Sequence, residues 1–170
     1  MDYKWFGAIL VVAGCGGFGF SLAAEVVRQE KLLRALLDSL DFMQWELSCR
    51  LTPLPQLLEL TAQRQTGRLR RVYRNLASQL EGHTEPRVDN CMRNVLEGEQ
   101  TLPGSARRVL VHLGKSLGRF DLAGQLKGLA SAQSLCRREL QSLEHGRDMR
   151  LRSYRTLGLC AGVALAVLLI

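Results

Sequence analysis

The distribution of charge along the chain is the feature that most restricts how it folds. Residues 5–24 contain no charged side chain, residues 156–170 contain none either, and nearly all of the charge lies between these stretches. As a helix, the first stretch would be about 30 Å long, the thickness of a bilayer's hydrocarbon core. The sequence therefore predicts a chain attached to a membrane at both ends. Its 170 residues leave room for one domain between the attachments, not for a multidomain enzyme.

The first predicted transmembrane helix covers residues 5–24. Tyr3 and Trp5 stand at one end, where aromatic rings favour the membrane interface, and a charged segment begins at Glu25. A cleaved signal peptide is the alternative, because Ser21-Leu22-Ala23 resembles a small-x-small cleavage site. The nearly neutral leading residues and the length of the apolar run favour the membrane span.

The second predicted transmembrane helix covers residues 153–170. Its apolar part, Leu157–Ile170, is shorter than the roughly 17 to 25 residues that usually cross a bilayer. A span is feasible if the helix starts near Ser153 and Arg155 extends its guanidinium back to the interface. A buried C-terminal core helix is the alternative.

Cationic residues flank both predicted spans on the side of the central segment, 25–152. They are Arg28, Lys31 and Arg34 after the first span, and Arg147, Arg150, Arg152 and Arg155 before the apolar part of the second. Cytoplasmic flanks are enriched in Lys and Arg, so this segment is predicted to be a cytoplasmic domain with both termini on the opposite side. The five cysteines show no spacing typical of disulfide pairs, which agrees with a reducing compartment such as the cytoplasm.

Apolar residues recur at helical spacing throughout the central segment. The seam after the first span comprises Leu33, Leu36, Leu40, Met43 and Leu47, and the seam before the second comprises Leu122, Leu126, Leu129, Gln133, Cys136, Leu140 and Leu143. We expect an all-α fold: an antiparallel helical bundle of about five to six cytoplasmic helices between the two transmembrane helices, with the two long seams paired. Thr52 is predicted to cap the second helix, and Asp121 to cap the last.

Recognisable catalytic chemistry is missing from the sequence. Gly114-Lys115-Ser116 resembles part of a phosphate-binding loop, but the earlier glycine is absent and the segment lies within a helical pattern. The three histidines are isolated from one another and from any metal-ligand spacing. We predict no catalytic, cofactor-binding or metal-binding residues, and hence a protein that is not an enzyme.

A basic surface is the basis of an alternative function. Its candidate residues are Arg68, Arg70, Arg71, Arg74, Arg107 and Arg108. They would suit a membrane-anchored module that binds anionic lipid or nucleic acid, although no stacking aromatic residues accompany them. A solvated helix face explains them more simply, and nucleic acid is not expected as a partner.

Small residues recur every four positions in both predicted spans. They are Ala13, Gly17 and Ser21 in the first, and Gly158, Gly162 and Ala166 in the second. Such faces let membrane helices approach closely, within one chain or between copies in a homo-oligomer. The alternative is that glycine is simply common in membrane helices.

Several local patterns together resemble the stage III sporulation protein AB family over essentially the whole chain. They are Gly19-Phe20, Glu46 followed by Thr52-Pro53-Leu54, the run LGKSLGRFDLAGQ at residues 113–125, and Leu157-Gly158. The most specific part is Leu113-Gly114, Leu117-Gly118, Asp121 and Gln125 in that spacing. Cys15-Gly16-Gly17 and Gln44-Trp45-Glu46 depart from the family pattern.

The resemblance implies a place in the sporulation channel complex of the mother-cell membrane around the forespore. The family is similar to the inner-membrane platform proteins of type II secretion and type IV pilus systems. The implied partners are the stage III sporulation protein AA ATPase, other components of the channel complex and the lipid bilayer. The implied interaction or structural motif comprises Glu46, Thr52, Pro53, Leu54, Gly114, Leu117, Gly118, Asp121 and Gln125. These residues either contact the ATPase or stabilise the fold of a helical corner.

Overall fold

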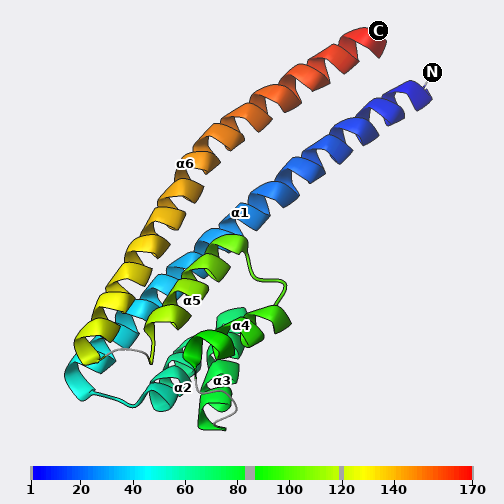
Figure 1. The fold of residues 1–170 in the computed structure, drawn as a ribbon. Coiled ribbons are helices and arrows are strands. Elements are labelled where there is room, and N and C mark those ends of the chain that lie inside the picture. Colours follow the sequence, from blue (N-terminus) through cyan, green and yellow to red (C-terminus); the bar gives the residue numbers. More distant parts are fainter. Residues whose placement is uncertain (1, 83–86, 119–120, 170) are drawn as a thin grey trace. The chain divides into compact units, whose positions relative to one another are not determined.

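The described part of the chain is entirely helical. The computed structural model describes residues 2–82, 87–118 and 121–169, with side chains for residues 24–82, 87–118 and 121–145. Within these ranges the helices are α1 (Asp2–Arg50), α2 (Leu54–Arg64), α3 (Gly67–Glu81), α4 (Val88–Gly98), α5 (Gly104–Ser116) and α6 (Leu122–Leu169), and there is no strand (Figure 1). The prediction of an all-α antiparallel bundle is confirmed.

The chain divides into two compact units. One comprises residues 31–140, and the other comprises residues 1–30 and 141–170. The second unit contains the predicted spans 5–24 and 153–170, whose side chains, apart from that of Ala24, lie outside the described residues. The same holds for the predicted packing residues Ala13, Gly17, Ser21, Gly158, Gly162 and Ala166. Among the described residues, no helix combines the length and the apolar character needed to cross a membrane.

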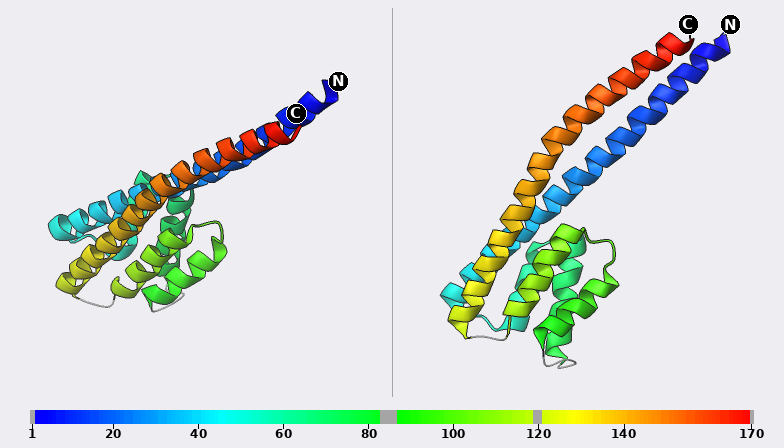
Figure 2. Two further views of the ribbon diagram at one scale, coloured as in Figure 1. Left: turned by 90° about the horizontal axis from the view of Figure 1, so that it is seen from above. Right: turned by 45° about the horizontal axis from the view of Figure 1, so that its top comes forward.

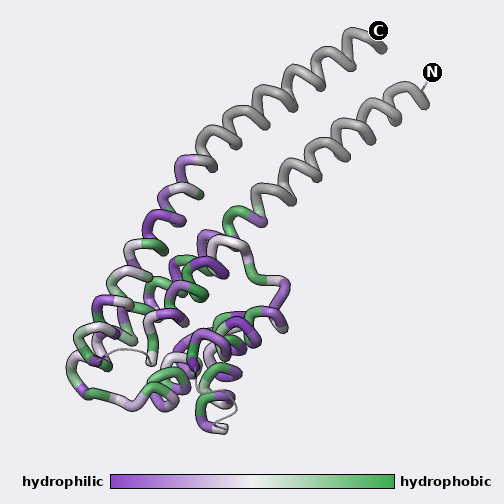
Figure 3. Tube along the Cα trace, in the orientation of Figure 1, coloured by the Kyte–Doolittle hydropathy of each residue, from purple (hydrophilic) through white to green (hydrophobic). Residues whose placement is uncertain are grey.

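Part of the core of the unit 31–140 lies where α1 and α6 pair. The whole predicted seam of α1 is buried, from Leu33 to Leu47. On α6, Leu129 and Cys136 are fully buried, and the Cys136 thiol donates to the Leu33 carbonyl oxygen at 3.4 Å. The predicted antiparallel pairing of the two seams is confirmed. Figure 3 shows how hydrophobic and hydrophilic residues alternate along the helices of this unit.

A polar contact crosses the same interface. The Gln133 side-chain amide donates to Asp41 Oδ1 at 2.9 Å and to Gln44 Oε1 at 2.7 Å. Gln133 is only 9% exposed, and a buried amide left without partners would be costly. These hydrogen bonds therefore specify which residues of α1 and α6 lie opposite one another.

The shorter helices α3 and α5 pack against the pair formed by α1 and α6. Tyr73 of α3 is fully buried, and its hydroxyl lies 2.6 Å from Ser39 Oγ of α1. Burial raises the pKa of the Tyr73 hydroxyl, which therefore stays neutral at neutral pH and can keep this hydrogen bond. Helix α5 lies alongside the first part of α6 (Figure 2). Their contacts run antiparallel, from Ser116 beside Gly128 to the Arg108–Glu139 ion pair.

Arginine side chains hold the turn between α4 and α5. Arg68 donates to the carbonyl of Thr101 at 2.8 Å, and Arg71 forms a two-point ion pair with Glu99 at 2.6 and 3.2 Å. Arg107 donates to a carbonyl in the last turn of α4 at 2.6 Å. A guanidinium at this end of a helix satisfies carbonyl oxygens that lack partners within the helix. These arginines, which the sequence suggested as a binding surface, thus have structural partners.

The prediction that Thr52 caps α2 is wrong. Pro53 occupies the position before α2, and no side chain caps that end. The Thr52 hydroxyl instead donates to Glu46 Oε2 at 3.1 Å. Glu46 is only 3% exposed, so its carboxylate needs a hydrogen-bond donor from the protein, which Thr52 supplies. The exposed N-terminal end of α2 can form hydrogen bonds with water instead.

Candidate functional site

The predicted motif residues lie at two corners of the unit 31–140, one between α1 and α2 and the other between α5 and α6. Glu46 belongs to the last turns of α1, and Thr52, Pro53 and Leu54 form its connection to α2. Gly114, Leu117 and Gly118 lie at the end of α5, and Asp121 and Gln125 lie at the start of α6. The structure brings Glu46 against Thr52, Leu54 near Gly118, and Asp121 beside Gln125. Gly114 packs instead on α4.

Two glycines, one in α5 and one just after its end, allow α4 to pack closely against α5. A Cβ on Gly114 would lie 2.7 Å from the Met92 Cβ and 2.9 Å from its Cγ. A Cβ on Gly118 would lie 2.6 Å from Val88 Cγ2 and 3.5 Å from the Leu54 side chain. Val88 and Met92 are one turn apart on α4, so the glycines, also four residues apart, oppose them in antiparallel register. The close helix approach predicted from this spacing is present.

Gly118 also ends α5. Its φ of +72° lies in the left-handed region, which glycine adopts without the steric penalty of a Cβ. It follows Leu117, which is fully buried and donates its N–H to the Leu113 carbonyl. A left-handed glycine just after a helix is a common C-terminal stop. The chain thereby leaves α5 and turns toward α6.

Asp121 starts α6. Its Oδ1 accepts a hydrogen bond from the Gly124 N–H at 3.0 Å, and its carbonyl accepts one from the Gln125 N–H at 2.9 Å. This is the N-cap geometry expected from the sequence, and a carboxylate also suits the positive end of the helix dipole. The arrangement from Gly114 to Gln125 is therefore a helical corner in which Gly114, Gly118 and Asp121 each have a structural role.

Glu46 is held by residues of its own chain. Besides Thr52, it pairs with Arg50 at 3.6 Å, and the Arg50 guanidinium lies 5.5 Å from the centre of the Trp45 ring. The Glu46 side chain is 4% exposed, whereas that of Arg50 is 65% exposed. Trp45 is itself 51% exposed. The carboxylate thus stabilises the end of α1 and leaves Arg50 and Trp45 at the surface.

One close contact in this region was missed by the sequence analysis. Gly128 of α6 faces Ser116 of α5, where a Cβ would lie 2.3 Å from the serine Cβ. Gly124, Gly128 and Ala132 are spaced by four, and this small-residue pattern could have indicated a close helix contact. Only the structure identifies α5 as the helix that uses it.

Within the described residues there is neither a metal-binding group nor a phosphate-binding loop. Across residues 24–82, 87–118 and 121–145, no group of three or more His, Cys, Asp or Glu could hold a metal ion. Gly114-Lys115-Ser116 is helical, and the Ser116 hydroxyl donates to the Leu113 carbonyl at 2.9 Å. A helical backbone has its N–H groups in helix hydrogen bonds, so this segment lacks the form of a phosphate-binding loop.

The comparisons with known proteins agree with this fold. A solved structure titled "Stage III sporulation protein AB" superposes with a TM-score of 0.61 at 19% identity, covering 69% of this chain and 94% of that one. This similarity shows the fold. The search of curated proteins finds no match. The sequence model of the family described as stage III sporulation protein AB matches residues 4–170. The resemblance noted in the sequence is confirmed, and the chain belongs to the stage III sporulation protein AB family.

Proposed function

We propose that this chain is a non-catalytic membrane platform of the sporulation channel complex between mother cell and forespore. In this role it anchors a cytoplasmic secretion-type ATPase, the stage III sporulation protein AA ATPase, to the membrane assembly and couples the two. The observation that carries the proposal is the family match over residues 4–170, which includes both predicted spans and the helical unit. The all-helical unit, without a metal-binding group among its described residues, supports a role in assembly.

The proposed location is the mother-cell membrane around the forespore. Two spans, 5–24 and 153–170, anchor the chain, the central segment 25–152 faces the cytoplasm, and both termini lie on the opposite side. The uncharged sequence of the spans and the cationic residues beside them support this arrangement. Cys49 and Cys136 are free thiols, which agrees with a reducing cytoplasm.

The predicted motif contributes to this function by shaping the helical unit. Glu46, Gly114 and Leu117 are buried, so their side chains offer little area to a partner. Their contacts fix the ends of α1, α5 and α6. We propose that ATPase contact involves exposed residues that these corners position, not the motif residues themselves.

The alternative of a lipid-binding or nucleic-acid-binding module has less support. Four of the six arginines proposed for it, Arg68, Arg71, Arg107 and Arg108, form hydrogen bonds or ion pairs within the helical unit. An arginine so engaged has fewer free N–H donors with which to bind a phosphate. Steep salt dependence of phosphate-polymer binding by the full-length chain would revive this alternative.

Copurification tests the coupling proposal. The full-length chain and the ATPase are coexpressed, solubilised in mild detergent and isolated through a tag on the chain. We expect the ATPase in the eluate, and crosslinking with light scattering should report a defined complex. If the pair neither crosslinks nor comigrates, the coupling proposal is wrong, whereas the family assignment stands.

Cysteine labelling from the two sides of the membrane tests the topology. Single cysteines replace Lys4, Arg87 and Ile170 in a chain whose native cysteines are serine. A membrane-impermeant maleimide should label position 87 only from the cytoplasmic side, and positions 4 and 170 only from the opposite side. Labelling of positions 87 and 170 from the same side would contradict the second span.

A further inference from the structure

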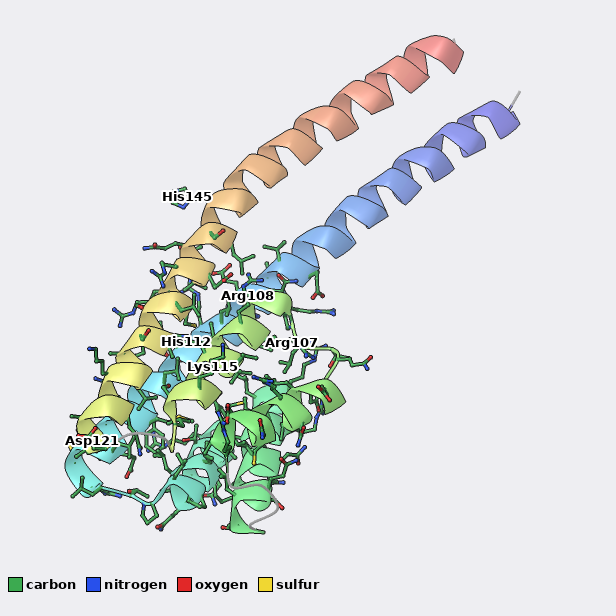
Figure 4. All side chains as sticks on the ribbon, in the orientation of Figure 1. Arg107, Arg108, His112, Lys115, Asp121 and His145 are labelled. Carbon is green, nitrogen blue, oxygen red and sulfur yellow. The ribbon has the colours of Figure 1, made fainter. Side chains whose placement is uncertain are left out.

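A basic groove runs between α5 and α6 on the surface of the unit 31–140. It has a volume of about 510 Å³ and is lined by Gly104, Arg107, Arg108, Val111, His112, Lys115 and Leu135 (Figure 4). Six of these residues lie on α5 between positions 104 and 115, a length of about 16 Å or three helical turns. The groove therefore has the length of a short helix.

The walls of the groove carry fixed positive charge. Arg108 uses Nε and Nη2 to bind Glu139 of α6 at 2.8 and 2.7 Å, and Arg107 donates through Nη2 to the end of α4. An arginine has five N–H donors, so each guanidinium is held in place with donors left over. Lys115 is exposed and has no ion-pair partner among the described residues. With one carboxylate against three cations, the groove is net positive.

The floor of the groove is apolar. Val111 and Leu135 are half-buried there, and Gly104 has no side chain to fill its end. His112, between the charged and apolar parts, is tied to Ser131 of α6 at 2.9 Å. Apolar residues below a cationic rim complement a partner that has apolar and acidic residues on one face.

We propose that this groove binds an acidic amphipathic helix of a partner protein. Arg108 and Lys115 are seven residues apart, about 10 Å along α5, so the best partner carries carboxylates two turns apart beside an apolar stripe. An apolar floor and guanidinium groups held by hydrogen bonds distinguish the groove from the flexible basic segments that bind membranes. The lining contains no aromatic ring on which a base could stack, which disfavours nucleic acid. This binding does not depend on the ATPase coupling or on the membrane topology proposed above.

Fluorescence anisotropy with a designed peptide tests the proposal. The probe is a stapled helix of about 14 residues with a leucine stripe and glutamates two turns apart, and its control has glutamine at those positions. We expect the full-length chain in neutral detergent to bind the glutamate peptide about tenfold more tightly than the glutamine peptide. Added salt should reduce that difference.

Matched variants locate the binding. Lys115→Glu should weaken binding of the glutamate peptide about tenfold. Val111→Ser should weaken both peptides, because it removes apolar floor. Arg70→Glu makes the same charge change at an exposed position of α3 and should alter the affinity less than about twofold. Circular dichroism verifies that each variant is folded.

Three results would overturn the proposal. They are no binding of the glutamate peptide, equal binding of the two peptides, and equal losses in Lys115→Glu and Arg70→Glu. A soluble short-chain phosphatidylglycerol and a single-stranded oligonucleotide serve as competing probes. If either binds in a Lys115-dependent way while the peptide does not, the groove belongs to an anionic lipid or a nucleic acid instead.

Discussion

Gly114 of α5 and Met92 of α4 are packed so closely that a methyl group on the glycine would lie 2.7 Å from the methionine Cβ. The neighbouring atoms belong to the base of the Met92 side chain, so they cannot move away without a shift of the helix. We expect Gly114→Ala to lower the free energy of unfolding by about 1–3 kcal/mol. Urea denaturation of the full-length chain in detergent, followed by circular dichroism, measures this loss.

Gly98→Ala is the control for the Gly114 substitution. Gly98 is also helical, at the end of α4, but a Cβ there meets no atom within 4 Å. Alanine should be neutral or slightly stabilising at this position, within about 1 kcal/mol. Equal losses in the two variants would show that the α4–α5 contact is not tight.

The ion pairs of Glu99 and Glu139 make stability depend on pH. The hydrogen bonds from Arg71 and Arg108 hold the pKa values of these carboxyls below the ordinary value of Glu, about 4.3. A lowered folded-state pKa contributes stability that is full above the unfolded-state value and is lost as pH falls through the folded-state value. Stability should therefore decline below about pH 4.3.

Glu99→Gln/Glu139→Gln isolates this contribution. The double variant should be less stable near neutral pH and show a shallower decline of stability in acid, because two linked protons are removed. Thermal unfolding of both chains across the acidic range gives the comparison. Parallel stability curves for the two chains would mean that other carboxyls control the acid response.

The cysteines of the helical unit should differ in reactivity. Cys49 is exposed, whereas Cys91 and Cys136 are buried. Burial, aided by the nearby carboxylates, raises the pKa of Cys136 to about 11, so almost no reactive thiolate is present at pH 8. Iodoacetamide followed by peptide mass spectrometry should find Cys49 modified in the folded protein, and all three after denaturation. Rapid native labelling of Cys136 would contradict the seam between α1 and α6.

The hydroxyl of Thr52 should matter through Glu46. Thr52→Val keeps the shape of the side chain but removes a donor to a carboxylate that is 3% exposed. We expect a loss of about 1–3 kcal/mol in the free energy of unfolding. Thr52→Ser restores the hydroxyl and should recover most of that loss. If valine and serine behave alike, the hydrogen bond contributes no measurable stability.

The periodic parts of the fold could be predicted from the sequence because burial of one helix face leaves a direct pattern. The α1 seam is buried as predicted, as are Leu129, Gln133 and Cys136 of the α6 seam. The ends of the seam on α6 are less regular: Leu122 is 40% exposed, because it lies in the first turn of the helix. Hydrophobic spacing predicts which face of a helix is apolar, but how far along the helix that face is buried depends on the neighbouring helices.

The polar contacts could not be predicted in this way. The hydrogen bond between Ser39 and Tyr73 joins residues 34 positions apart, and nothing local specifies it. The Thr52 error has the same origin, since a local capping rule could not include the competing carboxylate of Glu46. Leu51 follows α1 with a φ of 53°, in a region that favours glycine, so no glycine in the sequence marked the left-handed residue of that turn.

The antiparallel match of Gly114 with Met92, and of Gly118 with Val88, leaves α4 a single rotational setting. One residue inserted between Val88 and Met92 would rotate one of them by about 100° away from its glycine. Helix α4 could then pack only one of Val88 and Met92 against its glycine, and the other contact would be lost. The spacing of four in both segments should thus tolerate neither insertion nor deletion.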